Sequence, residues 1–288
     1  MRYYLLLHFI VLLWGFTPIL GKAISFGEFK LVLWRIFLTA PAIFAFALWK
    51  NSSLRLPLRD LLKVLGVGLI VGLHWIFFYG AIKVSNVSIT MAAFSCGALI
   101  TAFVEPLFYK RKIDRIEILF GALIIGAIIL ITRVEFGYVH GVILGVLAAV
   151  GSAFFSVFNG MLVKKGLKPS VISFYEMAGG GVGLLIYGIF SGDVSGDTFV
   201  MNPEDLGWLL ILSLVCTAFT FIASVEIMKE INPYTINLTV NLESVYAIIL
   251  AYFIFTDTES MSLSFYLGAG VIFLAVLSNG WIKFYRKK

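Results

Sequence analysis

Residues 61–82 read LLKVLGVGLIVGLHWIFFYGAI, a run of 22 residues whose one charged side chain, Lys63, lies near its start. A helix needs about 20 residues to cross the hydrocarbon core of a bilayer. Working outward from this run, we find nine others of similar character, at residues 3–24, 30–49, 88–109, 116–131, 139–163, 171–190, 206–228, 234–255 and 263–281. The pattern predicts an all-α integral membrane protein with ten transmembrane helices.

The composition excludes several other classes of protein. Of the 288 residues, 60% are hydrophobic and 13% are charged, whereas about 25% of the residues of a soluble domain are charged. Neither a soluble enzyme nor a disordered chain fits these values. The two cysteines, Cys96 and Cys216, lie inside apolar runs without metal-ligand spacing, and no phosphate-binding loop or His-Glu-x-x-His motif is found. We therefore expect no cofactor, no metal site and no enzymatic activity.

The basic residues predict the orientation in the membrane, because cytoplasmic loops are enriched in Lys and Arg. With the N-terminus in the cytoplasm, the cytoplasmic segments carry Arg2, Lys50, Arg55, Arg59, Lys63, Lys110, Arg111, Lys112, Arg115, Lys164, Lys165, Lys168, Lys229, Lys283, Arg286, Lys287 and Lys288. The opposite side carries only Lys22, Lys30, Lys83 and Arg133. Both termini are thus expected in the cytoplasm, and the net charge of +6 reflects this topology rather than nucleic-acid binding.

An internal repeat relates the two halves of the chain. With a shift of 146 positions, AIKVSN at 81–86 aligns with IMKEIN at 227–232, and LFGA at 119–122 aligns with YLGA at 266–269 after a one-residue slip. This divides the chain into residues 1–133 and 134–288, with five predicted spans each. Since five is odd, the second unit enters the membrane from the opposite side, an inverted repeat that is typical of secondary transporters.

Three motifs, in order along the chain, resemble a known family. They are LWGF at 13–16 followed by Lys22, then Arg35, and then NLESVY at 241–246 running on to FTD at 255–257. The chain is similar to the EamA branch of the drug/metabolite transporter superfamily, although Ser244 replaces the usual Pro and Asp257 the usual Glu. The resemblance implies an exporter or exchanger of small metabolites, and amino acids or their derivatives are the first expectation.

Polar residues within the spans are candidates for function, because burying them in a membrane is costly. Glu243 is the strongest, near the middle of its span. The polar residues of this span form two stripes on nearly opposite faces of the helix. One stripe contains Thr235, Thr239, Glu243 and Tyr246, and the other contains Asn237, Asn241 and Ser244. Either stripe fits a substrate cavity. Glu243 is expected to bind a proton or a substrate amine, and the alternative is a protonated side chain bonded to a neighbouring helix.

The remaining candidates were assigned to binding, coupling or gating. The predicted substrate-binding residues are Trp14, His74, Tyr79, Asn159, Tyr175, Glu176, Asn237, Asn241 and Glu243; the proton-coupling residues are Glu243 and His74; and the gate residues are Arg35 and Glu105. For most of these residues a purely structural role is the alternative. His74 and Asn159 fit helix–helix bonding, and Arg35 and Glu105 fit snorkelling toward the interface.

These features together predict a secondary transporter of small polar or amphipathic metabolites that works by alternating access. Proton coupling, uniport and exchange all remain open. The expected location is the inner, or plasma, membrane, and the expected partners are a small-molecule substrate, the lipid bilayer and protons, with the chain a monomer or a homodimer. The alternatives are a flippase for lipids or polyprenyl carriers and, less favoured, an intramembrane enzyme that acts on lipid-linked substrates.

Overall fold

The computed structural model describes residues 2–110, 112 and 115–286, and this part of the chain is helical without a β-strand. Seven stretches are long and apolar enough to cross a membrane: Arg2–Ala23, Glu28–Trp49, Leu58–Val84, Val87–Tyr109, Phe136–Lys164, Pro169–Ser191 and Pro203–Ile227. Three shorter apolar helices are Ile118–Ile131, Thr239–Ile254 and Leu263–Ala275. The prediction of a helical membrane protein is confirmed, while the count of ten crossings stays a prediction.

The helices follow one another through short connections. In chain order they are α1 (Arg2–Gly15), α2 (Thr17–Ala23), α3 (Glu28–Trp49), α4 (Leu58–Val84), α5 (Val87–Phe94), α6 (Gly97–Tyr109), α7 (Arg115–Val134), η1 (Phe136–Tyr138), α8 (Val139–Lys164), α9 (Pro169–Ser191), η2 (Gly196–Phe199), α10 (Pro203–Leu210), η3 (Ile211–Phe219), α11 (Thr220–Ile227), α12 (Pro233–Ile254), α13 (Thr256–Glu259) and α14 (Leu263–Arg286).

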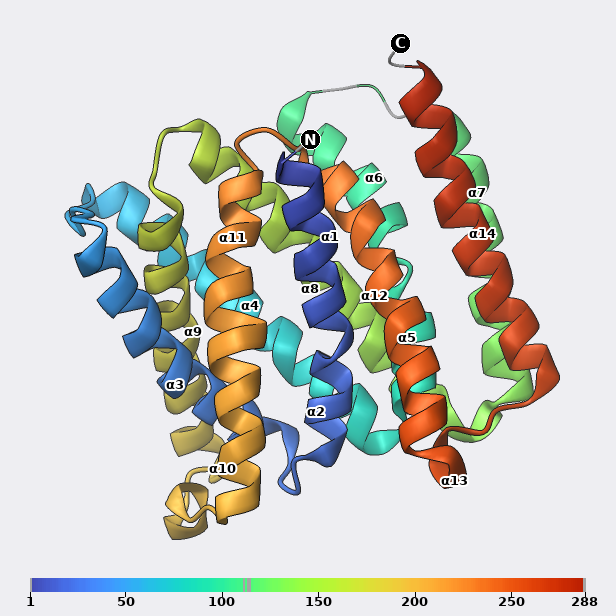
Figure 1. Ribbon diagram of the computed structural model, residues 1–288, viewed down its shortest axis with the longest axis horizontal. Coiled ribbons are helices and arrows are strands. Elements are labelled where there is room, and N and C mark those ends of the chain that lie inside the picture. The colour runs from blue at the N-terminus through green and yellow to red at the C-terminus, as the bar shows by residue number, and fades with distance from the viewer. Residues whose placement is uncertain (1, 111, 113–114, 287–288) are drawn as a thin grey trace.

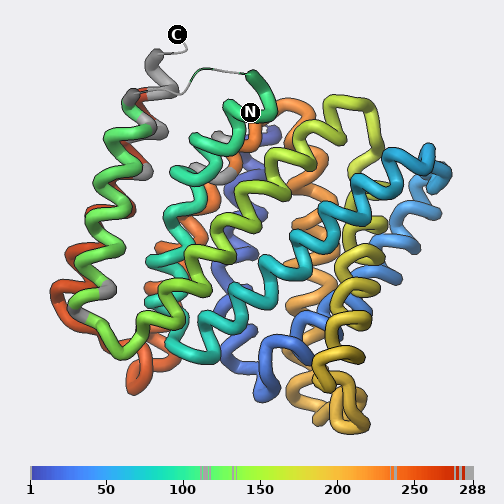
Figure 2. Tube along the Cα trace, turned by 180° about the vertical axis from the view of Figure 1, so that it is seen from behind, coloured from blue at the N-terminus to red at the C-terminus, as the bar shows by residue number. Residues whose placement is uncertain are grey.

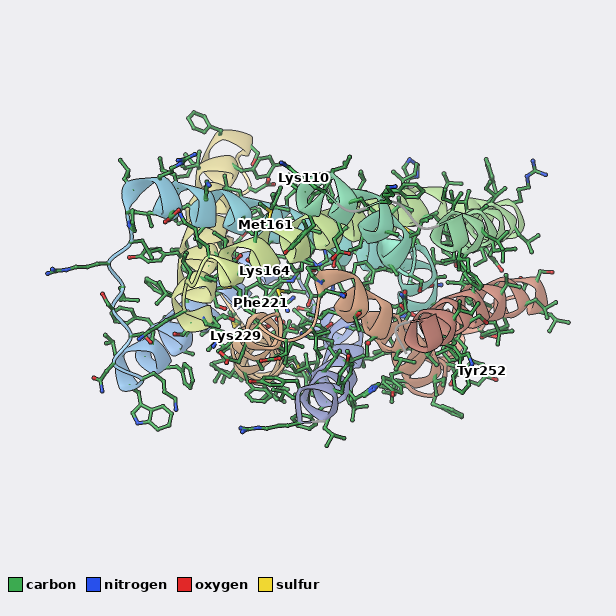
Figure 3. All side chains as sticks on the ribbon, turned by 90° about the horizontal axis from the view of Figure 1, so that it is seen from above. Lys110, Met161, Lys164, Phe221, Lys229 and Tyr252 are labelled. Carbon is green, nitrogen blue, oxygen red and sulfur yellow. The ribbon has the colours of Figure 1, made fainter. Side chains whose placement is uncertain are left out.

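The helices form a two-layered bundle. Figure 1 shows α1, α11, α12 and α14 on the near side, and Figure 2 shows α4, α6, α7 and α8 on the far side. The outermost pair, α7 and α14, packs together at one edge of the bundle. Both ends of the chain lie at the same end of the bundle (Figure 1). Figure 3 views this end, where Lys110 follows α6, Lys164 ends α8 and Lys229 lies just after α11.

Three of the predicted spans are not regular α-helices. The first is broken at Phe16, with Pro18 in the first turn of α2, and the fourth is broken between Phe94 and Gly97. The eighth contains the π-helical segment η3, in which the Thr217 hydroxyl donates to the Leu212 carbonyl oxygen at 2.6 Å. Breaks of this kind expose backbone groups and occur preferentially at functional sites of membrane proteins.

Glycines bring α4 and α9 into close contact. A Cβ atom placed on Gly68 would lie 2.2 Å from the backbone oxygen of Glu176, and one placed on Gly179 would lie 2.4 Å from the backbone oxygen of Leu65. Small residues at a helix crossing let two backbones approach within van der Waals contact, which drives helix association in lipid. The α4–α9 crossing therefore connects the N-terminal and C-terminal parts of the chain through a close backbone contact, called the α4–α9 joint below.

Candidate functional site

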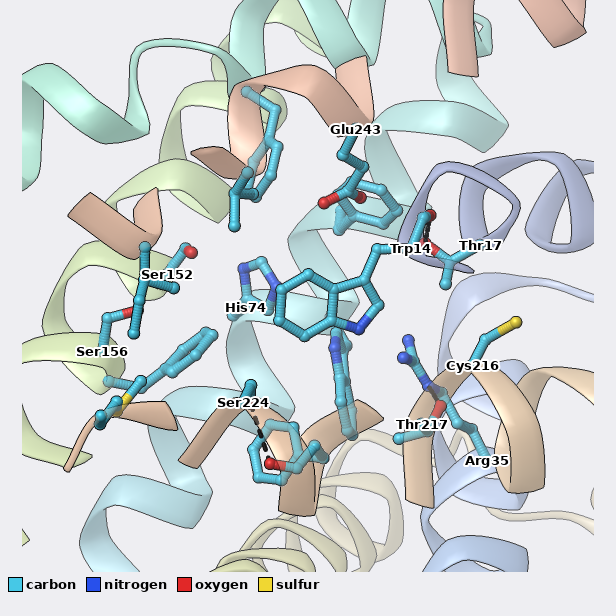
Figure 4. Close-up of a pocket in the computed structure, with 18 residues that line it drawn as sticks. Trp14, Thr17, Arg35, His74, Ser152, Ser156, Cys216, Thr217, Ser224 and Glu243 are labelled. Atoms are coloured by element: carbon cyan, nitrogen blue, oxygen red, sulfur yellow. Dashed lines mark hydrogen bonds between the residues drawn. The ribbon is translucent and has the colours of Figure 1, made fainter. Parts of the chain in front are cut away.

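A cavity lined by aromatic and apolar side chains and by a few polar ones lies between the two layers (Figure 4). Its volume is about 70 Å³, which is room for about five water molecules. All three irregular spans border it: Trp14 and Thr17 flank the first break, Phe94 precedes the second, and Cys216 and Thr217 belong to η3. The irregular spans thus shape the walls of the cavity.

Arg35, on α3, places a buried guanidinium group in the cavity wall. Its Nε donates to the Thr217 hydroxyl at 2.8 Å, and its Nη1 donates to the Tyr79 hydroxyl at 2.7 Å. The guanidinium carbon lies 3.9 Å from the centre of the Trp75 ring, a favourable cation–π geometry. A guanidinium group has five N–H donors, and no other hydrogen bond from it is found within the described residues. Arg35 therefore has donors left for an anionic group in the cavity.

Glu243, on α12, lines the same cavity and is 6% exposed. Within the described part of the chain its carboxylate forms no ion pair or hydrogen bond, and it interacts electrostatically, at longer range, with Arg35 and Tyr79. The face of α12 toward the cavity consists of Ile236, Val240 and Glu243. Of the polar stripe that contains Glu243, only Glu243 itself lines the cavity. The hydroxyl of Thr239, in the same stripe, donates to the carbonyl oxygen of Thr235 in its own helix.

His74, on α4, is fixed at the cavity by its Nδ1 atom, which lies 2.7 Å from the carbonyl oxygen of Ala148 on α8. A carbonyl oxygen only accepts, so Nδ1 carries a proton, and in the neutral ring Nε2 is an acceptor. The rings of Phe78, Phe94 and Phe155 surround the imidazole, with centroid distances of 6.1, 5.7 and 5.3 Å. His74 thus adds one polar edge to an otherwise aromatic wall.

Trp14 completes the aromatic wall, and its indole N–H donates to the Thr220 hydroxyl at 2.9 Å. Figure 4 shows both Trp14 and His74 among the residues that line the cavity. Five hydroxyl groups that the sequence did not point to also line the cavity, those of Thr17, Ser152, Ser156, Thr217 and Ser224. The four-residue spacing of Ser152 and Ser156 was the available signal, but Ser and Thr are common in membrane helices and bond their own backbone there.

Several predicted residues lie away from the cavity. Tyr79 does not line the cavity, and its hydroxyl accepts from Arg35 Nη1. The Tyr175 hydroxyl donates to the Leu54 carbonyl oxygen at 2.8 Å. Glu176 and Asn159 form a separate buried pair. Asn241 lies in a smaller pocket beside α14, with Ser244. The functional roles assigned to these residues stay predictions.

Two further residues, Glu105 and Asn237, were predicted to act in gating or in substrate binding. Glu105, predicted as a gate, is buried in the last half of α6, where its charge acts on Tyr109. The side chain of Asn237 lies outside the described residues. Neither residue is therefore connected to the cavity by the described contacts, and their roles also stay predictions.

The end of the bundle opposite the termini is fixed by Glu259, on α13. This carboxylate is fully buried, accepts from the backbone N–H groups of Val87 and Ser88 at 2.8 and 2.9 Å, and pairs with Lys22 Nζ at 2.6 Å. A negative charge at the N-terminus of α5 is favoured by the helix dipole. Asp257, which the resemblance aligned with the usual Glu, is exposed instead.

A helical membrane bundle whose irregular spans enclose a charged, aromatic cavity defines a membrane transport protein. The sequence profile of the EamA-like transporter family matches residues 1–133 and 139–280, so the chain belongs to this family. This agrees with the drug/metabolite transporter superfamily and with a membrane transporter of small molecules. The match over two parts of the chain also supports the internal repeat.

The fold is also similar to that of a solved structure described as "Crystal structure of protein". The TM-score is 0.72 at 13% sequence identity, and the similarity covers 100% of this chain and 99% of the other. At this identity the likeness shows the fold alone. No curated protein matches the sequence.

Proposed function

We propose that the protein is a secondary transporter, an exporter or exchanger, of small zwitterionic metabolites, with α-amino acids that carry apolar or aromatic side chains as the best candidates. One observation carries this proposal: a buried guanidinium with unused donors and a carboxylate without a hydrogen bond line one cavity. An α-amino acid supplies a carboxylate for Arg35 and an ammonium group for Glu243. Its side chain then lies against Trp14, Phe78 and Phe155, where aromatic rings favour apolar contact.

The electrostatic argument favours a zwitterion over a ligand with one charge. Taking a charged group out of water costs several kcal/mol unless a partner compensates for it. An anion alone adds no cation for the carboxylate of Glu243, and a cation alone adds no anion for the unused donors of Arg35. A zwitterion satisfies both. Because the cavity of about 70 Å³ is smaller than an amino acid, binding requires the two layers to separate around it.

The arrangement of the cavity and the bundle ends supports alternating access as the mechanism. The cavity lining extends along α11 to Met228, near the end of the bundle that carries the termini. The opposite end is held by Glu259 and Lys22. In our proposal the conformation described here faces the side of the termini, which the basic residues place in the cytoplasm, and the Glu259 contacts break when the transporter opens outward.

Substituting Glu259→Gln tests the outward gate. An amide at this position loses the charge that binds Lys22 and the N-terminus of α5, at a cost of about 1.5 kcal/mol. The balance between the two conformations should then shift about tenfold toward the outward-open form. Accessibility of a single cysteine introduced at the Val87 end of α5 to a membrane-impermeant reagent measures this shift.

Asp257→Asn is the matched control, because it removes an exposed carboxylate from the same short helix. It should leave the labelling rate unchanged. Equal labelling of wild type and Glu259→Gln would contradict the gate.

The direct test of transport is counterflow in proteoliposomes, with a zwitterionic amino acid compared with its deaminated and decarboxylated analogues. Only the zwitterion should exchange at an appreciable rate. Location in the inner membrane and a cytoplasmic N-terminus are part of the same proposal, and a reporter fused to either terminus tests them.

A further inference from the structure

A second polar cluster is buried outside the substrate cavity, between α8 and α9. Glu176 on α9 is 0% exposed, and Asn159 on α8 is 1% exposed. The Asn159 amide is the polar neighbour that acts on the carboxyl group. Both oxygens of Glu176 and both polar side-chain atoms of Asn159 lack a regular hydrogen bond to any described residue. Buried polar atoms of this kind are rare and call for an explanation.

Within the part of the chain that the structure describes, no charged group forms an ion pair with Glu176. The helices packed against α9 are α3, α4, α11 and, to a small extent, α8. Of the titratable groups on these helices, Arg35 of α3, Lys63 and His74 of α4, and Glu226 of α11 form no hydrogen bond or ion pair with Glu176 within the described residues. On the α4 side, Gly68 lies directly against the backbone of Glu176. The carboxyl is therefore enclosed by uncharged surroundings.

An ionised carboxylate in such surroundings costs several kcal/mol, so the group is neutral in this conformation and carries a proton. A neutral carboxyl group releases its proton only where water reaches it. The close α4–α9 joint leaves no room for water on that side. The α8 side, where α9 makes few contacts, is the route that remains.

The α8 side leads to the substrate cavity. Ser152 and Ser156 line the cavity, and Asn159 follows at a spacing of three residues, so the three side chains share one face of α8. His74 is bonded to Ala148, one turn before Ser152. A polar line thus runs along α8 from His74, past the cavity, to Asn159 and Glu176.

From this geometry we propose that Glu176, assisted by Asn159, is the proton-binding site that couples transport to a proton gradient, separate from the site that binds substrate. The coupling role rests on the proposed transport function. When the cavity widens for substrate, water reaches Asn159 and then Glu176, the carboxyl O–H bond breaks, and the proton passes to water. The cavity closes again only after the carboxylate is reprotonated, because burying it as an ion is costly.

Infrared spectroscopy of the full-length protein in lipid nanodiscs tests the proton site without any substrate. Wild type should show at neutral pH the C=O stretch of protonated carboxyl groups, and the difference spectrum between wild type and Glu176→Gln should show the loss of one of them. Glu226→Gln is the matched control, since that carboxylate is exposed and ion-paired with Lys229, and it should leave the spectrum in this region unchanged. A Glu176→Gln spectrum that equals that of wild type in this region overturns the proposal.

If Glu176→Gln does not accumulate in the membrane, Glu176→Asp serves in its place. It keeps a carboxyl at the site, and the band should shift in frequency; a band identical to that of wild type overturns the assignment.

Transport assays test the coupling itself. In wild-type proteoliposomes one pH unit supports up to about tenfold accumulation if one proton moves per substrate. Glu176→Gln should retain counterflow at equal pH and lose gradient-driven accumulation. Accumulation equal to wild type contradicts the coupling role. If wild type shows no counterflow, the proposed transport function fails, while the infrared result still decides whether Glu176 binds the proton.

Discussion

Substituting Glu243→Gln should weaken the binding of a zwitterionic amino acid by about 2–5 kcal/mol, a loss of thirtyfold or more. The amide keeps the size of the side chain and removes the charge that pairs with the substrate ammonium group. The loss is large because the site is buried, so water does not replace the missing partner. Calorimetric titration of the purified protein measures the change.

Analogues of the amino acid that carry only one of its two charges test whether Glu243 pairs with the ammonium group in particular. The deaminated acid, which has no ammonium group, should bind wild type and Glu243→Gln about equally. Substituting Arg35→Gln should have the opposite selectivity and spare the decarboxylated amine. Glu226→Gln, at the exposed pair with Lys229, is the control for removing a carboxylate elsewhere. Unchanged affinity of Glu243→Gln for the zwitterion would remove Glu243 from the binding site.

Substituting Gly68→Ala should destabilise the fold by about 3 kcal/mol, the upper part of the range for overpacking. The added Cβ would lie 2.2 Å from the backbone oxygen of Glu176 and 2.8 Å from its carbonyl carbon and Cα. Backbone atoms cannot rotate away, so α4 and α9 have to separate. The midpoint of thermal unfolding in detergent should fall, and the separation should also impair transport.

Gly66→Ala is the matched control on the same helix, because a Cβ at Gly66 meets no atom within 4 Å. Alanine has a higher helix propensity than glycine, by up to about 1 kcal/mol. This variant should therefore be as stable as wild type or slightly more stable. Equal unfolding midpoints for Gly68→Ala and Gly66→Ala would contradict the prediction, because they would show that α4 and α9 can separate enough for the added Cβ without loss of stability.

The sequence predicted the helical membrane fold and the repeat because hydrophobic runs report directly on the solvent around a helix. It did not predict where spans are irregular. Pro18 marks the first break and Ser95 with Gly97 marks the second, but the π-helix at Ile211–Phe219 has no proline or glycine to announce it. The π-helix arises from packing around the cavity and from hydroxyl groups that bond their own backbone, such as Thr217.

For the candidate site, sequence reasoning found the charged residues and missed the partners that fix them. Trp14, Arg35, His74 and Glu243 come together at one cavity, since a buried charge or large polar ring is conspicuous within an apolar run. The sequence did not predict that the hydroxyl of Tyr79 accepts a hydrogen bond from Arg35 and holds its guanidinium group in place. Nor could it separate Glu176 from the cavity, because depth along a helix does not specify which neighbour that helix meets.

Counterflow in proteoliposomes tests the central claim most directly, namely that the cavity between Arg35 and Glu243 carries a zwitterion across the membrane. Vesicles are loaded with an unlabelled apolar amino acid, and entry of the labelled compound is recorded. We predict transient accumulation with wild type, no accumulation with Glu243→Gln, and wild-type accumulation with Glu226→Gln. Accumulation of the deaminated analogue by wild type and Glu243→Gln alike, without exchange of any zwitterion, would contradict the account.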